Sequence, residues 1–211
     1  MERRSLSRPA RLHAQADGPE GASKGVEANA RLTGSTAAVL LVLLAAEGVT
    51  VLRIGPLLKP HVFIGMLLIP PTALKIGSTG YRFVRYYTGS LAYRRKGPPP
   101  ALLRLLGPLV VVLTIALMAS GVALLFAGAG LRQNLLLIHK ASFVLWLAAM
   151  TVHVLGHLLD TAKLAPRDFY WRTRKQVAGA GLRQWSIAAS LVVGALLAAV
   201  TVGRAGHFLV G

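Results

Sequence analysis

The stretch LLIHKASFVLWLAAMTVHVLGHLLD, residues 136–160, is mostly apolar yet contains three histidines. An α-helix needs roughly 20 apolar residues to cross the hydrocarbon core of a bilayer, so this stretch is long enough to span a membrane. Ionisable side chains inside lipid are costly and usually have a functional role. His139, His153 and His157 are therefore the first candidates for a functional site.

The composition of the whole chain also indicates a membrane protein. Of the 211 residues, 54% are hydrophobic and only 15% are charged, whereas soluble proteins carry about a quarter charged residues. The formal net charge of +17 does not indicate nucleic-acid binding, because the basic residues lie between apolar blocks rather than in one patch. The absence of cysteine excludes disulfides, thiolate metal sites and iron–sulfur clusters.

Five apolar segments predict an all-α integral membrane bundle of five transmembrane helices. We expect the helices at about 34–52, 61–79, 105–127, 133–159 and 185–203, within a membrane domain of residues 34–204. Residues 1–33 are polar and predict a disordered tail, and residues 205–211 predict a short C-terminal segment. Pro70 and Pro71 predict a kink in the second helix, because the carbonyls of Met66 and Leu67 lose their helical donors.

The charges of the loops orient these helices. The segment 80–104 carries six Lys and Arg residues and no acidic residue, and the segment 161–183 carries six against Asp168 alone. By the positive-inside rule, both segments and the N-terminal tail are cytoplasmic and the C-terminus is outside. We therefore expect a multi-pass protein of the cell membrane that is in contact with the lipid bilayer. The sequence neither requires nor excludes an oligomer.

Helical geometry places the three histidines on one face of the fourth helix. The 14-residue step from His139 to His153 returns to within about 40° of the same direction, and the 18-residue step to His157 closes about five turns. The same 14 residues rise about 21 Å along the helix axis. We therefore expect His139 near the outer face of the membrane, and His153 and His157 near the inner face.

His61 begins the second helix, which enters the membrane from the outside as the fourth helix does. His61 and His139 should therefore lie at a similar depth, where two imidazoles on neighbouring helices can hold a haem iron from both sides. Gly65, one turn after His61, leaves room for a porphyrin. The basic residues expected at this depth would pair with the haem propionates or contact a quinone. They are Arg53, Lys59 and Lys140.

Other ionisable residues have several interpretations. Glu47 lies about one turn from the outer end of the first helix, where it pairs with Lys140 or Arg53, handles protons at an outer quinone site, or simply reaches the interface. His153 and His157 are ligands of a second, inner haem, a metal pair, a proton relay, or part of a polar inner rim. The sequence leaves these alternatives open.

The H-x13-H spacing of His139 and His153 resembles that of transmembrane cytochromes b, including ferric-reductase-like membrane domains. The resemblance covers roughly residues 55–160. In those families two helices, separated by one intervening helix, present histidines at this spacing and hold two stacked haems. Here the position 14 residues after His61 is Lys75, so the resemblance lacks the second ligand of the inner haem. Some haem subunits of bacterial methionine-sulfoxide repair systems likewise have one histidine on the first ligand helix and two on the second.

Together these features predict a membrane b-type cytochrome subunit with one haem, or two. It would transfer electrons between a quinol or another donor and a partner redox protein. The alternative is a non-redox membrane protein, such as a small transporter or an assembly partner, whose histidines serve packing or proton movement. The two hypotheses differ in whether the protein carries a coloured cofactor.

Overall fold

The computed structural model describes the backbone of residues 19–95, 101–169 and 179–208, and the side chains of residues 25–95, 104–156, 179 and 181–206. This part of the chain is helical and contains no strand. Its elements are α2 (Pro19–Leu52), α3 (Ile54–Tyr87), α4 (Leu91–Arg95), α5 (Ala101–Phe126), α6 (Ala129–Phe169), α8 (Ala180–Thr201) and the 3-10 helix η1 (Val202–Phe208). Helices α2, α3, α5, α6 and α8 are long and apolar enough to cross a membrane. The predicted fold class, an all-α bundle of five transmembrane helices, is confirmed.

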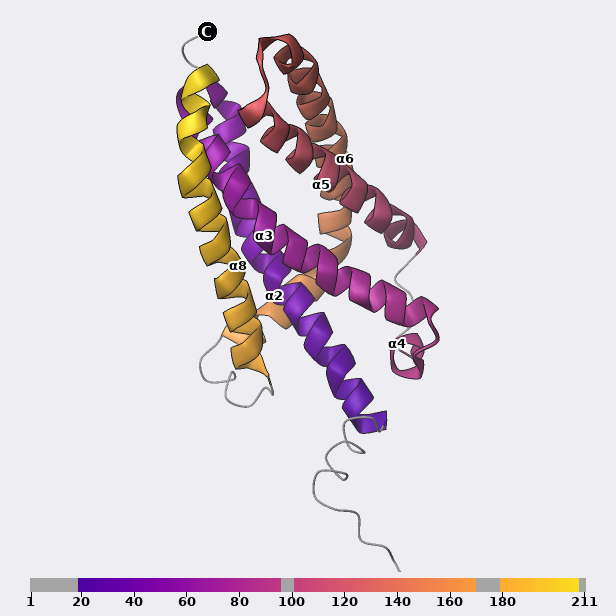
Figure 1. Cartoon of the computed structure of the whole chain (residues 1–211). Coiled ribbons are helices and arrows are strands. Elements are labelled where there is room, and N and C mark those ends of the chain that lie inside the picture. Colours follow the sequence, from indigo (N-terminus) through magenta and orange to yellow (C-terminus); the bar gives the residue numbers. More distant parts are fainter. Residues whose placement is uncertain (1–18, 96–100, 170–178, 209–211) are drawn as a thin grey trace, which may run out of the picture.

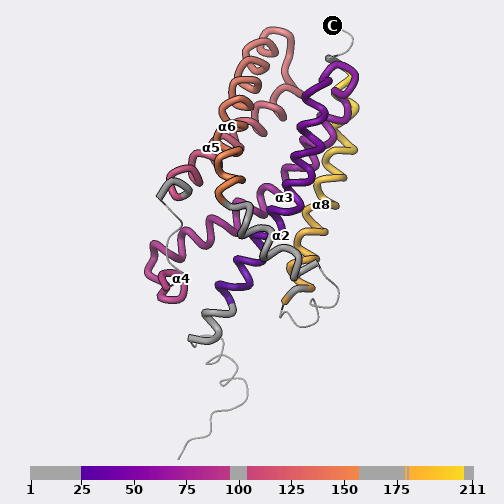
Figure 2. The backbone as a smooth tube through the Cα atoms, turned by 180° about the vertical axis from the view of Figure 1, so that it is seen from behind, coloured from indigo at the N-terminus to yellow at the C-terminus, as the bar shows by residue number. Residues whose placement is uncertain are grey.

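The long helices form two groups (Figure 1). Helix α3 packs against both α2 and α8, while α5 and α6 pair with each other across a short turn at Ala127 and Gly128. Contacts between α2 and α6 join the two groups. Figure 2, seen from behind, shows the α5–α6 pair beside the group of α2, α3 and α8.

The bundle has two ends that differ in charge. One end, which we call the turn end, carries the α2–α3 junction at Arg53, the α5–α6 turn and η1 (Figure 1). The opposite end, which we call the basic end, carries α4 and the starts of α5 and α8. The arginines of the basic end that are at least partly exposed are Arg82, Arg85, Arg94, Arg95 and Arg104.

Large apolar side chains cover the outside of the bundle. Among the most exposed are Val42, Val112, Ile115, Leu137, Val144, Leu145, Val193, Leu196 and Val200. In water such a surface would be strongly unfavourable, whereas in lipid it meets a matching apolar solvent. The helices satisfy their own backbone hydrogen bonds, as a chain inside hydrocarbon must.

Helix α2 begins earlier than the sequence predicts. Residues 19–33, expected to belong to a disordered tail, are helical in the structure, while residues 1–18 lie outside the described part. The reason is tertiary, because this polar segment packs against α3. Asn29 Nδ2 donates to the carbonyl of Ser78 at 3.0 Å, and the hydroxyl of Thr33 donates to that of Ser78 at 2.9 Å.

Helices α3 and α6 also continue past their predicted ends, to Tyr87 and Phe169. At the other end of the chain, η1 (Val202–Phe208) includes the end of the expected membrane domain and residues 205–208 of the expected C-terminal segment. Residues 209–211 lie outside the described part. Hydropathy predicts only the apolar part of a helix. The predicted helix is therefore too short wherever the real helix continues beyond the hydrocarbon core.

The main irregularity of α3 lies near its start rather than at the proline pair. Leu57 has non-helical backbone angles (φ −103°, ψ 15°), whereas Pro70 and Pro71 keep helical ones. Pro60 explains the kink, since it has no N–H to bond the carbonyl four residues earlier. Both views show α3 running away from α8 in its C-terminal half (Figures 1 and 2).

The proline pair has a different consequence, which involves α8. Pro71 leaves the carbonyl of Leu67 without its helical donor. Gly194 of α8 lies directly against this carbonyl, and a methyl group at Gly194 would overlap the Leu67 oxygen. Only glycine lets the two backbones approach this closely, as small residues do at helix crossings in membranes.

We expect Gly194→Ala to destabilise the protein by about 1–3 kcal/mol, because the added methyl group must push α8 away from α3. The measurement is thermal unfolding of the detergent-solubilised protein, followed by circular dichroism. Gly181→Ala is the matched control, since Gly181 lies on the same helix with open space around it for a methyl group. Equal melting temperatures for the two variants would contradict the close α3–α8 contact.

Candidate functional site

His61 of α3 and His139 of α6 lie next to each other toward the turn end of the bundle. Their ring centres are 6.4 Å apart and their ring planes make an angle of 79°. Both helices begin at the turn end, and the two histidines lie about two and three helical turns from these starts. The two imidazoles therefore lie close together, at the similar depth that the topology predicts.

The carboxylate of Glu47 orients the ring of His61. Nδ1 of His61 lies 2.9 Å from Glu47 Oε1, and both side chains are mostly buried (22% and 15% exposed). The hydroxyl of Thr50 lies 3.0 Å from the same nitrogen and donates to the Glu47 carbonyl at 2.6 Å. The last two turns of α2 therefore supply both groups, and Nδ1–H of His61 donates to the carboxylate.

The ring of His139 is oriented in a similar way by α5. Its Nδ1 lies 3.1 Å from the carbonyl oxygen of Leu117 and 3.0 Å from the hydroxyl of Ser120, which itself donates to that carbonyl at 3.0 Å. Because a carbonyl can only accept, Nδ1 of His139 carries the hydrogen. Both histidines thus use Nδ1 as a donor, and Nε2 of each is left as the basic nitrogen.

Gly121 of α5 leaves the space that the ring of His139 occupies. A methyl carbon at Gly121 would lie 3.0 Å from Cε1 of His139, which is closer than the ring tolerates without moving. The ring therefore packs closely against the backbone of α5 at Gly121. Gly65, expected to leave room for a porphyrin, faces the carboxylate of Glu47, whose Oε1 would lie 3.4 Å from a methyl carbon at Gly65.

The basic residues expected around this site lie at the surface. Arg53, Lys59 and Lys140 are all exposed. In the part of the chain whose side chains are described, the Glu47 carboxylate contacts His61 and not any of these cations. The three cations therefore remain available to anionic groups at the turn end.

His153, the remaining histidine whose side chain is described, does not join the pair. His153 is half-buried on α6, and its 14-residue separation from His139 corresponds to about 21 Å. The side chain of His157 lies outside the described residues. Lys75, at the position where a second ligand of α3 would stand, donates from Nζ to the carbonyl of Thr33 at 2.9 Å.

Trp146 shares the histidine face of α6 but packs against α5. Its Nε1 donates to the hydroxyl of Thr114 at 2.9 Å, and the side chain is 8% exposed. This residue therefore fixes the α5–α6 pair rather than lining the space between the histidines. Thr50, Ser120 and Gly121 were not identified from the sequence. In the sequence they are simply small or hydroxylated residues within apolar helices. Such residues also occur where helices merely pack together, so they do not indicate a functional site by themselves.

The site offers two imidazoles and one carboxylate that is already hydrogen-bonded. Among the residues with described side chains, no group of three or more His, Asp or Glu residues is arranged to hold a metal ion. Two free Nε2 atoms can therefore hold a metal only if the rest of its coordination comes from a bound group, as the four porphyrin nitrogens of a haem provide.

The fold and site define an all-α integral membrane protein of five helices with a histidine pair toward one end. Comparisons of the chain with protein-family models, with curated proteins and with solved structures found no match.

The Glu47–His61 pair should contribute more to stability than a surface ion pair does. In a double-mutant cycle of Glu47→Ala and His61→Ala, we expect a coupling energy of about 1.5–3 kcal/mol, because the hydrogen bond is charge-assisted and mostly shielded from solvent. The measurement is chemical or thermal unfolding in detergent.

Glu27 and Arg31, which pair at i,i+4 on α2, provide a comparison in which the carboxylate is 62% exposed while the guanidinium is mostly buried. Because solvent screens the exposed Glu27 carboxylate, their cycle should give a smaller coupling energy than the Glu47–His61 cycle. A Glu47–His61 coupling no larger than the Glu27–Arg31 coupling would show that the carboxylate does not orient the imidazole.

Proposed function

We propose that the protein is the haem-bearing subunit of a membrane electron-transfer system, with His61 and His139 as the axial ligands of one b-type haem. The observation that carries this proposal is the pairing of two imidazoles from different helices, each with Nδ1 hydrogen-bonded and Nε2 left basic. Histidines that bind a metal through Nε2 typically have the other ring nitrogen hydrogen-bonded to a neighbouring acceptor, as both do here.

The spacing of the rings supports the assignment. Two imidazoles would hold one haem iron between them only if their rings lie close together. The ring centres of His61 and His139 are 6.4 Å apart, with an angle of 79° between the ring planes.

The residues around the pair would hold the ligands in place. The Glu47 carboxylate keeps the hydrogen of His61 on Nδ1 and strengthens Nε2 as an electron donor, while the Leu117 carbonyl keeps the hydrogen of His139 on Nδ1. Arg53, Lys59 and Lys140 are exposed cations suited to the propionates of the haem. A bound haem would supply reversible one-electron chemistry at this point.

A single haem fits the described residues better than two. An inner haem next to His153 would need a second ligand from α3, and the residue at the matching position is Lys75. Its ammonium group donates to the Thr33 carbonyl of α2 and is not a usual haem ligand. His153 and His157 therefore stay outside the proposed haem site.

We expect the purified protein, expressed with adequate haem and reduced with dithionite, to show the split absorption bands of a low-spin b-type haem. His61→Ala and His139→Ala should each abolish this spectrum, because each removes one axial ligand. His153→Ala is the matched control on α6 and should retain it. Gly121→Ala should weaken haem binding, since its methyl group displaces the ring of His139.

Two results would contradict the proposal. A colourless protein would favour the non-redox alternative, in which the Glu47–His61 pair serves packing or proton movement. A low-spin spectrum that survives in both His61→Ala and His139→Ala would show that haem binds elsewhere.

We also propose that the basic end faces the cytoplasm of a cell membrane and the turn end faces outward. The support is the concentration of arginine around α4 and at the start of α5, which the positive-inside rule assigns to the cytoplasmic side. A quinol in the bilayer or a cytoplasmic donor would then deliver electrons, and a partner redox protein would exchange them with the haem from outside.

The orientation can be tested by cysteine labelling, because the natural chain has no cysteine. We expect a membrane-impermeant maleimide to label Gly128→Cys, in the α5–α6 turn, on intact cells. Thr88→Cys, at the end of α3, should react only after the cells are permeabilised. Both positions are exposed in the structure. The opposite labelling pattern would reverse the proposed orientation.

A further inference from the structure

At the basic end of the bundle, the chain reverses direction between α3 and α4. The N–H of Ser90 donates to the carbonyl of Arg85 at 3.1 Å, and Gly89 has a φ of +93°. This is the Schellman motif, in which a glycine in the left-handed region ends a helix. The reversal places α4 beside the C-terminal end of α3 (Figures 1 and 2).

Side-chain contacts hold α4 in this position. The ring of Tyr93, which is 7% exposed, packs edge-on against the ring of Tyr81 of α3, with ring centres 6.1 Å apart. Nε of Arg94 lies 3.5 Å from the carbonyl oxygen of Tyr86 in the last turn of α3, where the helix dipole favours a cation. The short helix is therefore a fixed part of this surface.

The reversal brings four arginines together on one surface, which we call the arginine platform. Arg82 is partly exposed and the other three are exposed. The pKa of Tyr93 is raised by burial and by Tyr81, against the opposing positive charges of Arg85 and Arg82. Both guanidinium groups of α3 therefore lie close to α4, which carries the other two. The platform consists of Arg82, Arg85, Arg94 and Arg95.

The arginine platform has no carboxylate partner in the part of the chain whose side chains are described. Residues 48–159 contain no Asp or Glu. The two carboxylates with described side chains are those of Glu27 and Glu47, which contact Arg31 and His61. Four neighbouring positive charges create a field that attracts an anion. The guanidinium fork suits the oxygens of a phosphate in particular.

The apolar side chains around the arginine platform select a lipid as the anion. Phe83, Val84 and Tyr87 lie between or beside the arginines of α3 and are 52–55% exposed, and Leu91 of α4 is 70% exposed. Helix α3 is long and apolar enough to span a membrane and ends at Tyr87, so the platform lies where hydrocarbon gives way to headgroups. An acidic soluble protein would match the arginines but not these side chains, whereas a phospholipid offers a phosphate and hydrocarbon together.

We propose that the arginine platform binds the headgroup of an anionic phospholipid, whose acyl chains lie against Phe83 and Leu91. Several guanidinium groups favour a lipid with net negative charge over a zwitterionic one, in which the headgroup cation cancels the phosphate. The inference depends neither on haem binding nor on which side of the membrane the basic end faces.

The test is a lipid titration of the purified, delipidated full chain, followed by native mass spectrometry. The probes are phosphatidylglycerol and phosphatidylcholine with the same acyl chains. We expect phosphatidylglycerol to bind at least about tenfold more tightly than phosphatidylcholine. The preference should shrink as the ionic strength of the buffer is raised, because salt screens exposed charges.

Single substitutions separate the arginine platform from the net charge of the protein. Arg85→Gln and Arg94→Gln should each lower the affinity for phosphatidylglycerol about three- to fivefold, with the affinity for phosphatidylcholine unchanged. Arg85→Lys keeps the charge and should restore most of the affinity. Arg204→Gln is the matched control, since it removes one exposed arginine at the turn end and should leave the preference intact. Circular dichroism confirms that each variant is folded.

Three results would overturn the proposal. The first is equal binding of the two lipids by the natural protein, which needs no variant to measure. The second is an equal loss of affinity in Arg204→Gln and Arg85→Gln, which would show attraction by net charge alone. The third is binding of inorganic phosphate or of a polyglutamate peptide as tightly as phosphatidylglycerol, which would make a free anion or an acidic protein the occupant.

Discussion

Polar side chains inside the five apolar helices must find partners within the chain, because hydrocarbon offers none. This constraint organises the bundle. Glu47 and Thr50 of α2 hold His61 of α3, and the Leu117 carbonyl of α5 holds His139 of α6. Each of these hydrogen bonds crosses between helices, so the polar residues fix which helices are neighbours and at what depth.

The same constraint explains the basic end of the bundle. Lys75 of α3 donates to the carbonyl of Thr33 on α2, and Ser78 accepts hydrogen bonds from the same helix. These bonds extend α2 into a polar segment that has no apolar face of its own. They also engage Lys75 at the position where a second haem ligand would stand, so the bundle has one paired histidine site among its described residues.

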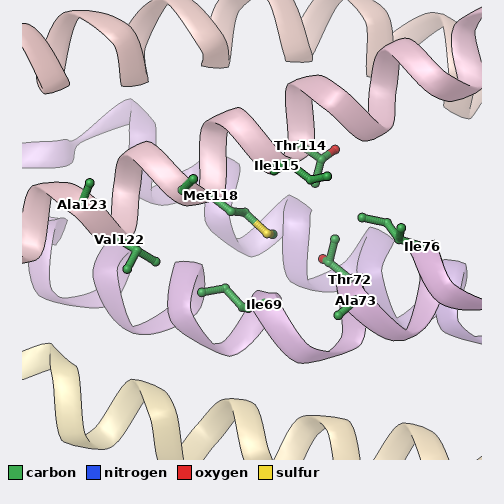
Figure 3. A pocket seen from close by; sticks show the side chains of 10 residues that line it. Ile69, Thr72, Ala73, Ile76, Thr114, Ile115, Met118, Val122 and Ala123 are labelled. Carbon is green, nitrogen blue, oxygen red and sulfur yellow. The ribbon is translucent and has the colours of Figure 1, made fainter.

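Backbone chemistry determines how closely the helices approach. Pro71 removes the helical partner of the Leu67 carbonyl, and Gly194 allows α8 to lie directly on that oxygen. Gly121 plays a related part for α5, because it lets the ring of His139 pack against the helix backbone. Where the C-terminal half of α3 leaves α8, it faces α5 across an apolar cleft lined by residues such as Ile69 and Met118 (Figure 3). The histidine pair and the cleft therefore both depend on the path of α3.

The sequence by itself determined the fold class and the candidate ligands. Five long apolar blocks leave no other way to bury so much hydrocarbon surface, and helical periodicity with alternating topology is enough to place His61 and His139 at one depth. The sequence alone did not determine that Glu47 pairs with His61 or that Leu117 and Ser120 orient His139. Nor did it determine that residues 19–33 are helical. Those contacts join residues that are distant in the chain, and only the packing of whole helices decides which polar groups meet. Periodicity fixes the direction of a side chain around its own helix, whereas its partner depends on the crossing and kinking of the helices, which the tertiary structure alone decides.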